Sequence, residues 1–252
     1  GILNVVFFSP EDLNIIKNGP AERRRFIDLE LSQLDKVYLN DLGNYNRIIN
    51  QRNKLLKDIS FNSGLKDTLD IWDIQLIEYG EKVIQARKKF VSDINEIISE
   101  IHKKLTGNQE QIEVIYEPNT GGQSLGDVIQ RNRERDLRMM STTSGPHRDD
   151  ICFQVDGIDI RKFGSQGQQR TAALSLKLSE IELVKMLTKD KPVLLLDDVL
   201  SELDKHRQNY LLDSIDDIQT LITCTGVDEF VNHRFSINKI FYVHEGQVRN
   251  EN

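Results

Sequence analysis

A short run of apolar residues near the start of the chain predicts a buried strand. Residues 4–8 read NVVFF, and Ser9 and Pro10 close the run. A compact apolar run that ends at a turn signal is typical of such a strand. The Asn-Gly-Pro step at 18–20 then breaks the chain. Pro20 suits the first turn of a helix, because that turn does not need its N–H group.

The next part of the chain carries apolar residues every three or four positions, as one face of an α-helix does. One stripe covers 27–59, where Arg52 interrupts it, and a second covers 69–105. The turn signal FNSG at 61–64 separates the stripes, and TGN at 106–108 ends the second. Two stripes of similar length joined by a turn predict an antiparallel helical hairpin. Each arm would span roughly 60 Å at about 1.5 Å per residue.

The rest of the chain alternates between strand-like and helix-like patterns. Strands are predicted at 112–116, 151–155, 158–163, 193–196, 221–224, 240–243 and 247–248, the last two as a hairpin. Helices are predicted at 125–140, with Ser124 as the candidate N-cap, and at 168–189 and 203–215. The Asp156-Gly157 step is a strong signal for a tight hairpin. The run 193–196 shows no alternation, which is typical of a parallel strand buried on both faces. This rhythm predicts an α/β sheet.

Composition narrows the class of protein. The chain has 252 residues, 38% of them hydrophobic, with a formal net charge of −7. This apolar content can build the core of one large domain or two smaller ones. The negative net charge excludes a protein surface that is basic throughout, as in some nucleic-acid-binding proteins, but it does not exclude a local basic face. Two cysteines without a CxxC motif fit a reducing cytosol. No apolar run has the length of a membrane span, and five histidines without ligand spacing predict no zinc site.

An apolar strand that ends in two carboxylates marks a first candidate site. Residues 194–196 are leucines, and Asp197 and Asp198 follow them. Open α/β sheets bind ligands at the carboxyl ends of their strands. In a nucleotidase the first such carboxylate holds Mg²⁺, and an adjacent one can orient or deprotonate an attacking water. By itself this motif is weak, because a strand that ends in a polar loop explains it equally well.

A second motif lies about thirty residues upstream and favours the ligand site over an ordinary polar loop. Residues 164–170 read GSQGQQR and open a predicted helix. The free N–H groups of a helix start, the helix dipole and the small size of glycine together make an anion site. The segment SELD at 201–204 follows the Asp pair. The ordered set of loop, helix, strand, Asp pair and Ser-x-Leu-Asp favours a nucleotide site over a flexible capped loop.

This ordered set resembles the head of the ABC-type ATPases, with a signature motif, a Walker B strand and a Ser-x-Leu-Asp loop. Residues 163–171 and 194–204 more narrowly resemble the RecF family of bacterial DNA replication and repair proteins, which is related to the structural-maintenance-of-chromosomes proteins. The segment GPHRDD at 145–150 and the stretches 4–13 and 19–26 also match that family. The resemblance spans nearly the whole chain and is densest over 145–204.

The resemblance implies an α/β fold: an ABC-type P-loop ATPase head with an inserted antiparallel helical-hairpin arm. Residues 1–19 would carry a strand of the head, and 20–111 would form the helical arm domain. Residues 112–252 would form the head lobe with the signature motif, the Walker B strand and the D-loop, which is the Ser-x-Leu-Asp segment at 201–204.

The resemblance also implies a role for each matching residue. The signature loop would bind, from one protomer, the γ-phosphate of ATP held by a second protomer, and it comprises Ser165, Gln166, Gly167 and Gln168. Asp197 would hold Mg²⁺. Asp198 would stand where many ABC-type ATPases have a catalytic Glu. Ser201 and Asp204 of the D-loop would line the dimer interface.

Two departures from the family pattern qualify these roles. The sequence contains no G-x-x-x-x-G-K-[ST] loop. In the resembled family this loop lies near the N-terminus, so we expect the chain to be the carboxyl-terminal portion of a longer protein and to be inactive by itself. No His follows the strand that ends at 223–225, where ABC transporters usually have one, so Thr223 or Thr225 would take a weaker polar role. With Asp198 in place of Glu, we expect slow, DNA-stimulated hydrolysis by the full-length dimer.

The implied function is recombinational repair in the cytoplasm, within the response to DNA damage known as the SOS response. With ATP and Mg²⁺ the protein would dimerise, clamp DNA at gaps or junctions, and help RecO and RecR to load RecA on single strands. A different class of function is also open: a non-enzymatic helical module that recruits a protein partner and keeps vestigial nucleotide motifs. A third, a head of the structural-maintenance-of-chromosomes type, is disfavoured by arms of roughly 40 residues each.

Candidate DNA contacts are arginines. Four lie on the predicted helix at 125–140, namely Arg131, Arg133, Arg135 and Arg138. Such clusters contact the phosphate backbone, but acidic neighbours make an ordinary exposed helix face an equal alternative. Arg148 joins them through the family resemblance. The RRR run at 23–25 also has acidic neighbours, so a solvated helix face explains it at least as well as a phosphate contact.

Overall fold

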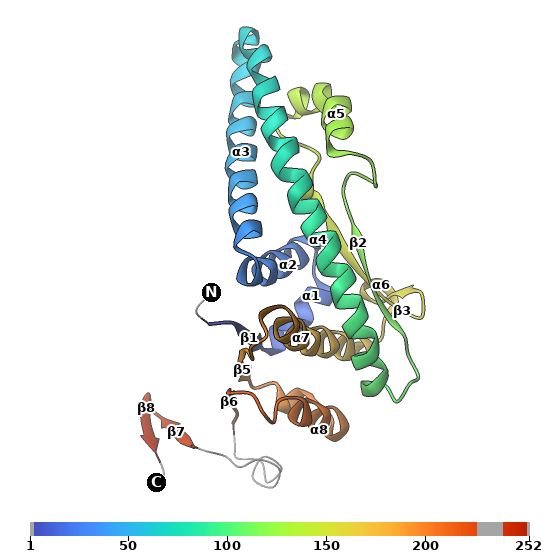
Figure 1. Cartoon of the computed structure of the whole chain (residues 1–252), viewed down its shortest axis with the longest axis vertical. Helices are drawn as coiled ribbons and strands as arrows, with labels where there is room; N and C mark the ends of the chain where they lie inside the picture. The colour runs from blue at the N-terminus through green and yellow to red at the C-terminus, as the bar shows by residue number, and fades with distance from the viewer. Residues whose placement is uncertain (1–2, 226–238, 251–252) are drawn as a thin grey trace.

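The computed structural model describes residues 3–225 and 239–250. Its most extended feature is the helical arm, formed by α3 (Lys36–Phe61) and α4 (Leu69–Leu105) side by side (Figure 1). The predicted antiparallel helical hairpin is therefore confirmed. The connection between the two helices contains the predicted turn and a short 3₁₀ helix, η2 (Ser63–Thr68).

The prediction of two arms of similar length is wrong, because the first stripe is divided at Asp35. Helix α2 (Pro20–Leu34) ends there, where the backbone of Asp35 is extended (φ −131°, ψ 108°). The side chain of Asp35 then caps α3 by accepting a hydrogen bond from the N–H of Val37 at 2.8 Å. Helix α3 consequently has 26 residues, whereas α4 has 37.

A three-stranded parallel sheet carries the first predicted strand and the Asp pair. Its order is β1 (Val5–Phe8), β5 (Val193–Asp197) and β6 (Thr220–Thr223). The prediction of a parallel strand is confirmed for β5, which lies between the other two. Burial on both faces is not complete, because Leu194 and Leu196 are buried whereas Val193 and Leu195 on the other face are half-buried. Helix α7 (Gln166–Thr188) and helix α8 (Lys205–Ser214) contribute to the same apolar core, and α7 packs on α4.

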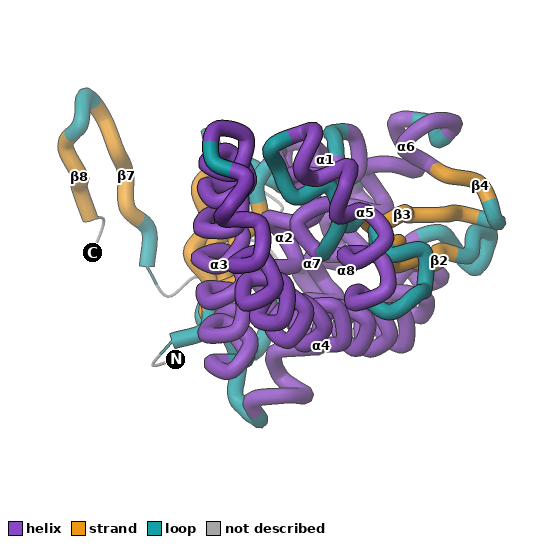
Figure 2. The backbone as a smooth tube through the Cα atoms, turned by 90° about the horizontal axis from the view of Figure 1, so that it is seen from above, coloured by secondary structure: helices purple, strands orange, loops and turns teal. Residues whose placement is uncertain are grey.

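A second sheet is antiparallel and lies at one side of the molecule (Figure 2). It consists of β2 (Ile112–Glu117), β3 (Asp150–Val155) and β4 (Ile158–Asp159). The predicted hairpin at Asp156-Gly157 is confirmed, and both residues have the positive φ that such a turn requires. The strand predicted to run to 163 is wrong beyond Asp159, which caps helix α6 (Ile160–Phe163) instead.

The remaining elements are short, apart from one helix. Helix α5 (Leu125–Met139) begins at Ser124, whose side chain caps it as predicted. The last predicted hairpin is also confirmed, by β7 (Phe241–His244) and β8 (Gln247–Asn250). The other helical turns are α1 (Leu13–Lys17), η1 (Pro10–Asp12), η3 (Pro146–Arg148) and η4 (Leu200–Glu202). Within the described ranges, no helix combines the length and the apolarity that a membrane crossing requires.

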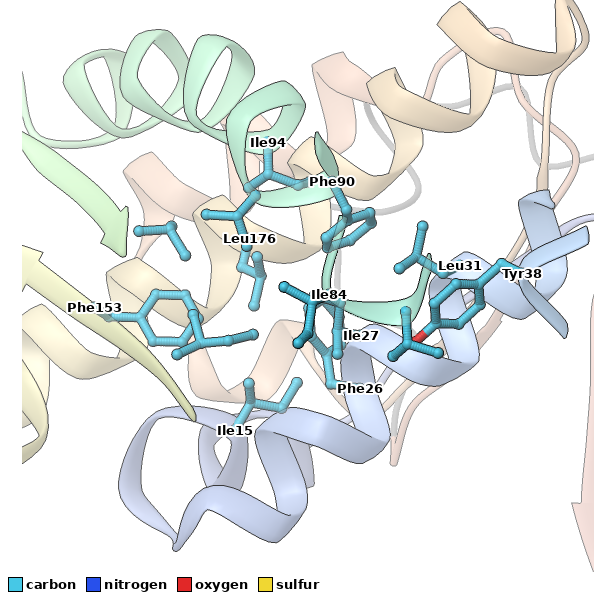
Figure 3. Packing of buried hydrophobic residues seen from close by; sticks show 14 of the residues in the cluster. Ile15, Phe26, Ile27, Leu31, Tyr38, Ile84, Phe90, Ile94, Phe153 and Leu176 are labelled. Atoms are coloured by element: carbon cyan, nitrogen blue, oxygen red, sulfur yellow. The ribbon is translucent and has the colours of Figure 1, made fainter. Parts of the chain in front are cut away.

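Helix α4 joins the arm to the sheets because it supplies both large apolar clusters. Figure 3 shows the first cluster, in which Phe26 and Phe90 meet edge to face with their ring centroids 6.3 Å apart. Further along α4, Ile101 and Leu105 belong to the second cluster, around the parallel sheet. Gly80 of α4 allows Leu125 to approach closely, since a Cβ there would lie 2.3 Å from its Cδ2 atom.

Candidate functional site

Asp197 lies at the carboxyl end of the central strand β5, where open sheets bind ligands. Its partner in register on the neighbouring strand β6 is Thr223. The hydroxyl of Thr223 donates a hydrogen bond to Oδ1 of Asp197 at 2.5 Å. Asp197 is otherwise exposed. The edge of the sheet therefore presents a carboxylate that is oriented by a hydroxyl and open to a ligand.

Asp198 follows in a left-handed backbone conformation, with φ 49°. Its N–H group donates to the carbonyl of Thr223 at 3.2 Å, and its carbonyl accepts from the hydroxyl of Ser201 at 2.8 Å. Within the described residues, Oδ1 of Asp198 is buried and has no hydrogen-bond partner. A buried carboxylate oxygen without a partner is costly. In the described part of the chain, Oδ1 of Asp198 is therefore an unsatisfied acceptor next to Asp197.

The oxygens at this edge fit a magnesium ion. Mg²⁺ prefers oxygen ligands, and it usually uses one or two carboxylates together with waters and substrate phosphates. Asp197 and the unpartnered Oδ1 of Asp198 supply oxygens of this kind. Across residues 3–225 and 239–250, no group of three or more His, Cys, Asp or Glu side chains forms a metal-binding cluster.

The signature loop opens helix α7, a helix of 23 residues. Ser165 and Gln168 form a capping box: the N–H of Gln168 donates to Oγ of Ser165 at 3.1 Å, and the N–H of Ser165 donates to Oε1 of Gln168 at 2.9 Å. Ser165, Gln166 and Gly167 are exposed. The positive end of a long helix is thus presented to solvent with its first turn held in shape.

The residue before this loop must be glycine because the chain turns tightly there. A Cβ on Gly164 would lie 2.6 Å from the carbonyl oxygen of Ile160. At Gly167 the situation differs, since the nearest atom to an added Cβ is the Ser165 hydroxyl at 3.8 Å. Gly164 therefore sets the path of the chain, whereas Gly167 leaves the helix start open to a ligand.

The D-loop and the signature loop are connected through two residues that the sequence did not single out. Asp204 caps α8 and forms an ion pair with Arg207. The guanidinium of Arg207 also donates from Nη2 to Oγ1 of Thr171 at 2.7 Å, and this hydroxyl donates to the carbonyl of Gly167 at 2.8 Å. The Asp-x-x-Arg spacing at the helix start is the sequence signal for Arg207, and Thr171 is marked only as the last residue of the family-like segment 163–171.

The protonation state of Asp204 is suited to this connection. Hydrogen bonding from the backbone N–H of Arg207, together with the charge of its guanidinium, lowers the pKa of Asp204. Ser201, the other D-loop residue in the predicted site, is exposed and contacts the backbone of Asp198. The structure thus brings the D-loop into contact with both the Asp pair and the signature helix.

The five candidate DNA-binding arginines are divided between two elements. Helix α5 carries four of them, and Arg148 lies in the short helix η3. Arg133 forms ion pairs with Asp70 and Asp73, which attach α5 to α4. Arg131 is exposed and donates to the side chain of Gln123 at 2.8 Å. Arg135, Arg138 and Arg148 are exposed. Their role in DNA binding stays a prediction.

The segment 145–150, which carries part of the family resemblance, is held by buried arginines. Arg87 donates to the carbonyl of Pro146 at 2.7 Å and pairs with Asp149 at 3.1 Å. Arg23 pairs with Asp150 at 2.6 Å and is only 2% exposed. The hypothesis that Arg23 belongs to a solvated helix face is therefore wrong. Its neighbour Arg24 is half-buried and donates to the carbonyl of Asp149.

Comparison with known proteins found relatives that share about 60% of their residues with this chain over nearly its whole length. A scan against protein-family models found no match. A relative from Lachnospira eligens, described as DNA replication and repair protein RecF, is 61% identical over 254 residues, covering 100% of this chain and 70% of the relative. A protein of the same description from Agathobacter rectalis is 62% identical over 248 residues, covering 98% of this chain and 68% of the relative.

Solved structures give the same result. A structure described as the recombination mediator protein RecF-ATP in the RecFOR pathway is 37% identical and matches with a TM-score of 0.91, covering 100% of this chain and 68% of that chain. An Smc head domain from Pyrococcus furiosus matches with a TM-score of 0.50 and 16% identity, covering 98% of this chain and 61% of that chain, and shows likeness of fold alone. These similarities confirm the expected fold, an ABC-type ATPase head with an inserted helical hairpin.

Proposed function

This chain belongs to the RecF family of DNA replication and repair proteins, and we propose that the protein acts as an ATP-dependent dimer on DNA. In this proposal it works in the cytoplasm as a recombination mediator, and it helps RecO and RecR to load RecA at single-stranded gaps. The family membership rests on relatives that are about 60% identical over the whole chain. A structural relative described as RecF-ATP supports ATP as the nucleotide.

The signature loop is the part of this chain that we assign to nucleotide bound by the partner protomer. Ser165 and Gly167 are exposed at the positive end of α7, where backbone N–H groups and the helix dipole favour a phosphate. Gln168 keeps this turn in shape through the capping box. The same exposure leaves the loop free to contact a second protomer. This exposed, preorganised loop is the observation that carries the proposal.

We assign metal binding and water activation to the Asp pair. Asp197 would hold Mg²⁺ at the end of β5, and the ion, when bound, neutralises charge on the phosphates. Thr223 orients the Asp197 carboxylate by donating to its Oδ1. Asp198 would accept a proton from a water, and its Oδ1, which has no hydrogen-bond partner among the described residues, is the oxygen that we assign to this role. An Asp side chain is one methylene shorter than Glu, which supports slow hydrolysis.

The test of this proposal is ATP-dependent dimerisation of the full-length protein, measured by analytical ultracentrifugation with and without ATP and Mg²⁺. In Ser165→Arg, a long cation fills the space that a phosphate would take, so we expect this variant to remain monomeric. Ser60→Arg is the matched control, because Ser60 is an exposed serine at the far end of α3. Dimerisation of Ser165→Arg at the ATP concentration that suffices for the unchanged protein would contradict the role of the loop.

A second measurement separates the alternative function. Labelled ATP is titrated against the full-length protein under dilute conditions. Saturable binding supports the nucleotide-dependent dimer. If the full-length protein binds no ATP, the non-enzymatic recruitment module becomes the better account of the helical hairpin, and the nucleotide motifs are vestigial.

A further inference from the structure

The signature loop is tied to the base of the helical arm by one carboxylate. Glu110 lies between the end of α4 and the start of β2. Its Oε1 atom accepts a hydrogen bond from Nε2 of Gln168 at 3.0 Å. Gln168 is the residue whose Oε1 atom caps the N–H of Ser165. The two ends of the Gln168 amide are therefore both engaged, one with Glu110 and the other with the signature loop.

This contact decides which way the Gln168 amide points. An ionised carboxylate only accepts hydrogen bonds, whereas an amide has a donor end and an acceptor end. Glu110 consequently selects the orientation in which the nitrogen faces Glu110 and the oxygen faces Ser165. With the amide turned over, two oxygens would meet at Glu110 and two donors would meet at Ser165. Glu110 thus enforces the acceptor that the capping box needs.

The other oxygen of Glu110 faces a buried histidine on the arm helix. Oε2 lies 3.4 Å from Nε2 of His102, whose side chain is fully buried. On the opposite side of the ring, Nδ1 lies 2.9 Å from Oγ of Ser175 in α7. Ser175 already donates its proton to the carbonyl of Thr171 at 2.8 Å, so Nδ1 must be the donor to Ser175.

The tautomer leaves the face of His102 toward Glu110 without a proton in the neutral ring. Nε2 is buried and makes no hydrogen bond among the described residues. Burial lowers the pKa of His102, Glu110 and Asp156 oppose that shift, and Arg207 adds to it. A second proton on the ring would complete a bond to Glu110. His102 therefore forms a polar bridge from α4 to α7, one end of which meets the carboxylate that holds Gln168.

We propose that Glu110 is a positioning residue that holds the signature loop in its phosphate-binding shape and joins it to the base of arm helix α4. The proposal rests on the proposed function, in which this loop binds ATP of the partner protomer. Helix α4 runs 37 residues from the arm tip to His102 and beyond, and it packs along α7. A displacement of the arm base is thereby transmitted to Gln168, and through Gln168 to Ser165.

The test compares three variants of the full-length protein: Glu110→Ala, Glu110→Gln and Glu113→Ala. Glu110→Ala removes the acceptor and frees the Gln168 amide. Glu110→Gln keeps the shape and one acceptor oxygen and removes the charge. Glu113→Ala is the matched control, because Glu113 is an exposed carboxylate three positions further along. For each variant we measure the dimer dissociation constant with ATP and Mg²⁺, the affinity for labelled ATP at a dilution where the protein is monomeric, and the thermal midpoint without nucleotide.

We expect Glu110→Ala to weaken the ATP-dependent dimer by about tenfold, the effect of losing a hydrogen bond to a charged group. Glu110→Gln should recover part of this loss, and Glu113→Ala should match the unchanged protein. ATP affinity of the monomer should stay the same in all three, because the loop acts on the partner's nucleotide. If Glu110 only stabilised the fold, Glu110→Ala would lower the thermal midpoint and would weaken ATP binding by the monomer as well as dimerisation.

Each other result overturns a defined part of the account. If Glu110→Ala dimerises as the unchanged protein does while Ser165→Arg does not, the positioning role is wrong and the proposed function stands. Equal weakening by Glu110→Ala and Glu113→Ala also overturns the positioning role. If the unchanged protein does not dimerise with ATP, the proposed function is wrong and the positioning role is wrong with it.

Discussion

Arg207 donates a hydrogen bond from Nη2 to Oγ1 of Thr171 at 2.7 Å. The donor lies in the helix that begins at the D-loop, and the acceptor lies in the second turn of the signature helix. The same guanidinium pairs with Asp204, and the same hydroxyl bonds to the carbonyl of Gly167. One arginine therefore holds two proposed interface loops in a single arrangement, so that they meet a partner protomer together.

Replacing Thr171 with valine tests this connection with little change of shape. Thr171→Val removes the acceptor of Arg207 and the bond to Gly167. We expect ATP-dependent dimerisation of the full-length protein to weaken about fivefold, within the range that one hydrogen bond contributes. Thr188→Val is the control, because Thr188 lies at the other end of α7 and its hydroxyl bonds to the nearby backbone of Val184 and Asp190. Equal effects of the two changes would count against the connection.

Replacing Asp197 with asparagine tests the metal assignment. Asp197→Asn keeps an oxygen that can accept from Thr223 and removes the charge that would hold Mg²⁺. We expect the Mg²⁺ concentration required for ATP hydrolysis by the full-length protein to rise at least about tenfold, as expected from the loss of one charged contact. Asp190→Asn, at an exposed turn after α7, should leave the Mg²⁺ titration unchanged. If the Mg²⁺ titration of Asp197→Asn is unchanged, Asp197 does not bind the metal ion.

Replacing Arg52 tests how much the buried ion pairs of the arm contribute to stability. It is fully buried, and it pairs with Asp73 at 2.6 Å and with Asp136 at 2.7 Å. Arg52→Met leaves the buried Asp136 without its cation and Asp73 with Arg133 alone, so we expect the free energy of unfolding to fall by about 3–5 kcal/mol. Urea unfolding followed by circular dichroism measures this change. Arg47→Met, at an exposed position of α3, should change the free energy of unfolding by less than about 0.5 kcal/mol.

His147 should make the stability of the fold depend on pH. Its Nε2 atom donates to the carbonyl of Thr142 at 3.1 Å, so Nδ1 accepts from the hydroxyl of Tyr45 at 2.7 Å. Burial lowers the pKa of His147 from 6.5 to about 4. The unfolded chain therefore binds the proton more readily, and stability should fall as the pH decreases from 6.5 to about 4, by about 3 kcal/mol in total.

The measurement is the free energy of unfolding from urea titrations across this pH range. In His147→Gln the amide can keep both hydrogen bonds and does not titrate. The loss of unfolding free energy between pH 6.5 and about 4 should therefore be smaller by about 3 kcal/mol in this variant. His206→Gln, at an exposed position of α8, is the control and should keep the slope of the unchanged protein. A slope that persists in His147→Gln would assign the pH dependence to other groups.

Features that depend on neighbours in the sequence were predicted well. The strand at 193–196 and the hairpin at Asp156-Gly157 lie where their patterns place them. The cap at Ser124 is also confirmed. Each depends on a few adjacent residues whose backbone preferences and polarity are visible in the sequence. The ordered motifs at the two candidate loops were visible for the same reason.

The sequence by itself determined the strands, most of the helices, the family and the residues of the two candidate loops, because these follow from local preferences and ordered motifs. Only the tertiary structure decided which charges are buried and what the loops contact. The acidic neighbours of Arg23 favoured a solvated position, yet Arg23 is buried and its partner Asp150 lies 127 positions away. Glu110 and Gln168 are 58 positions apart. Ion pairs and hydrogen bonds between distant segments depend on how whole elements pack, and no local pattern records that packing.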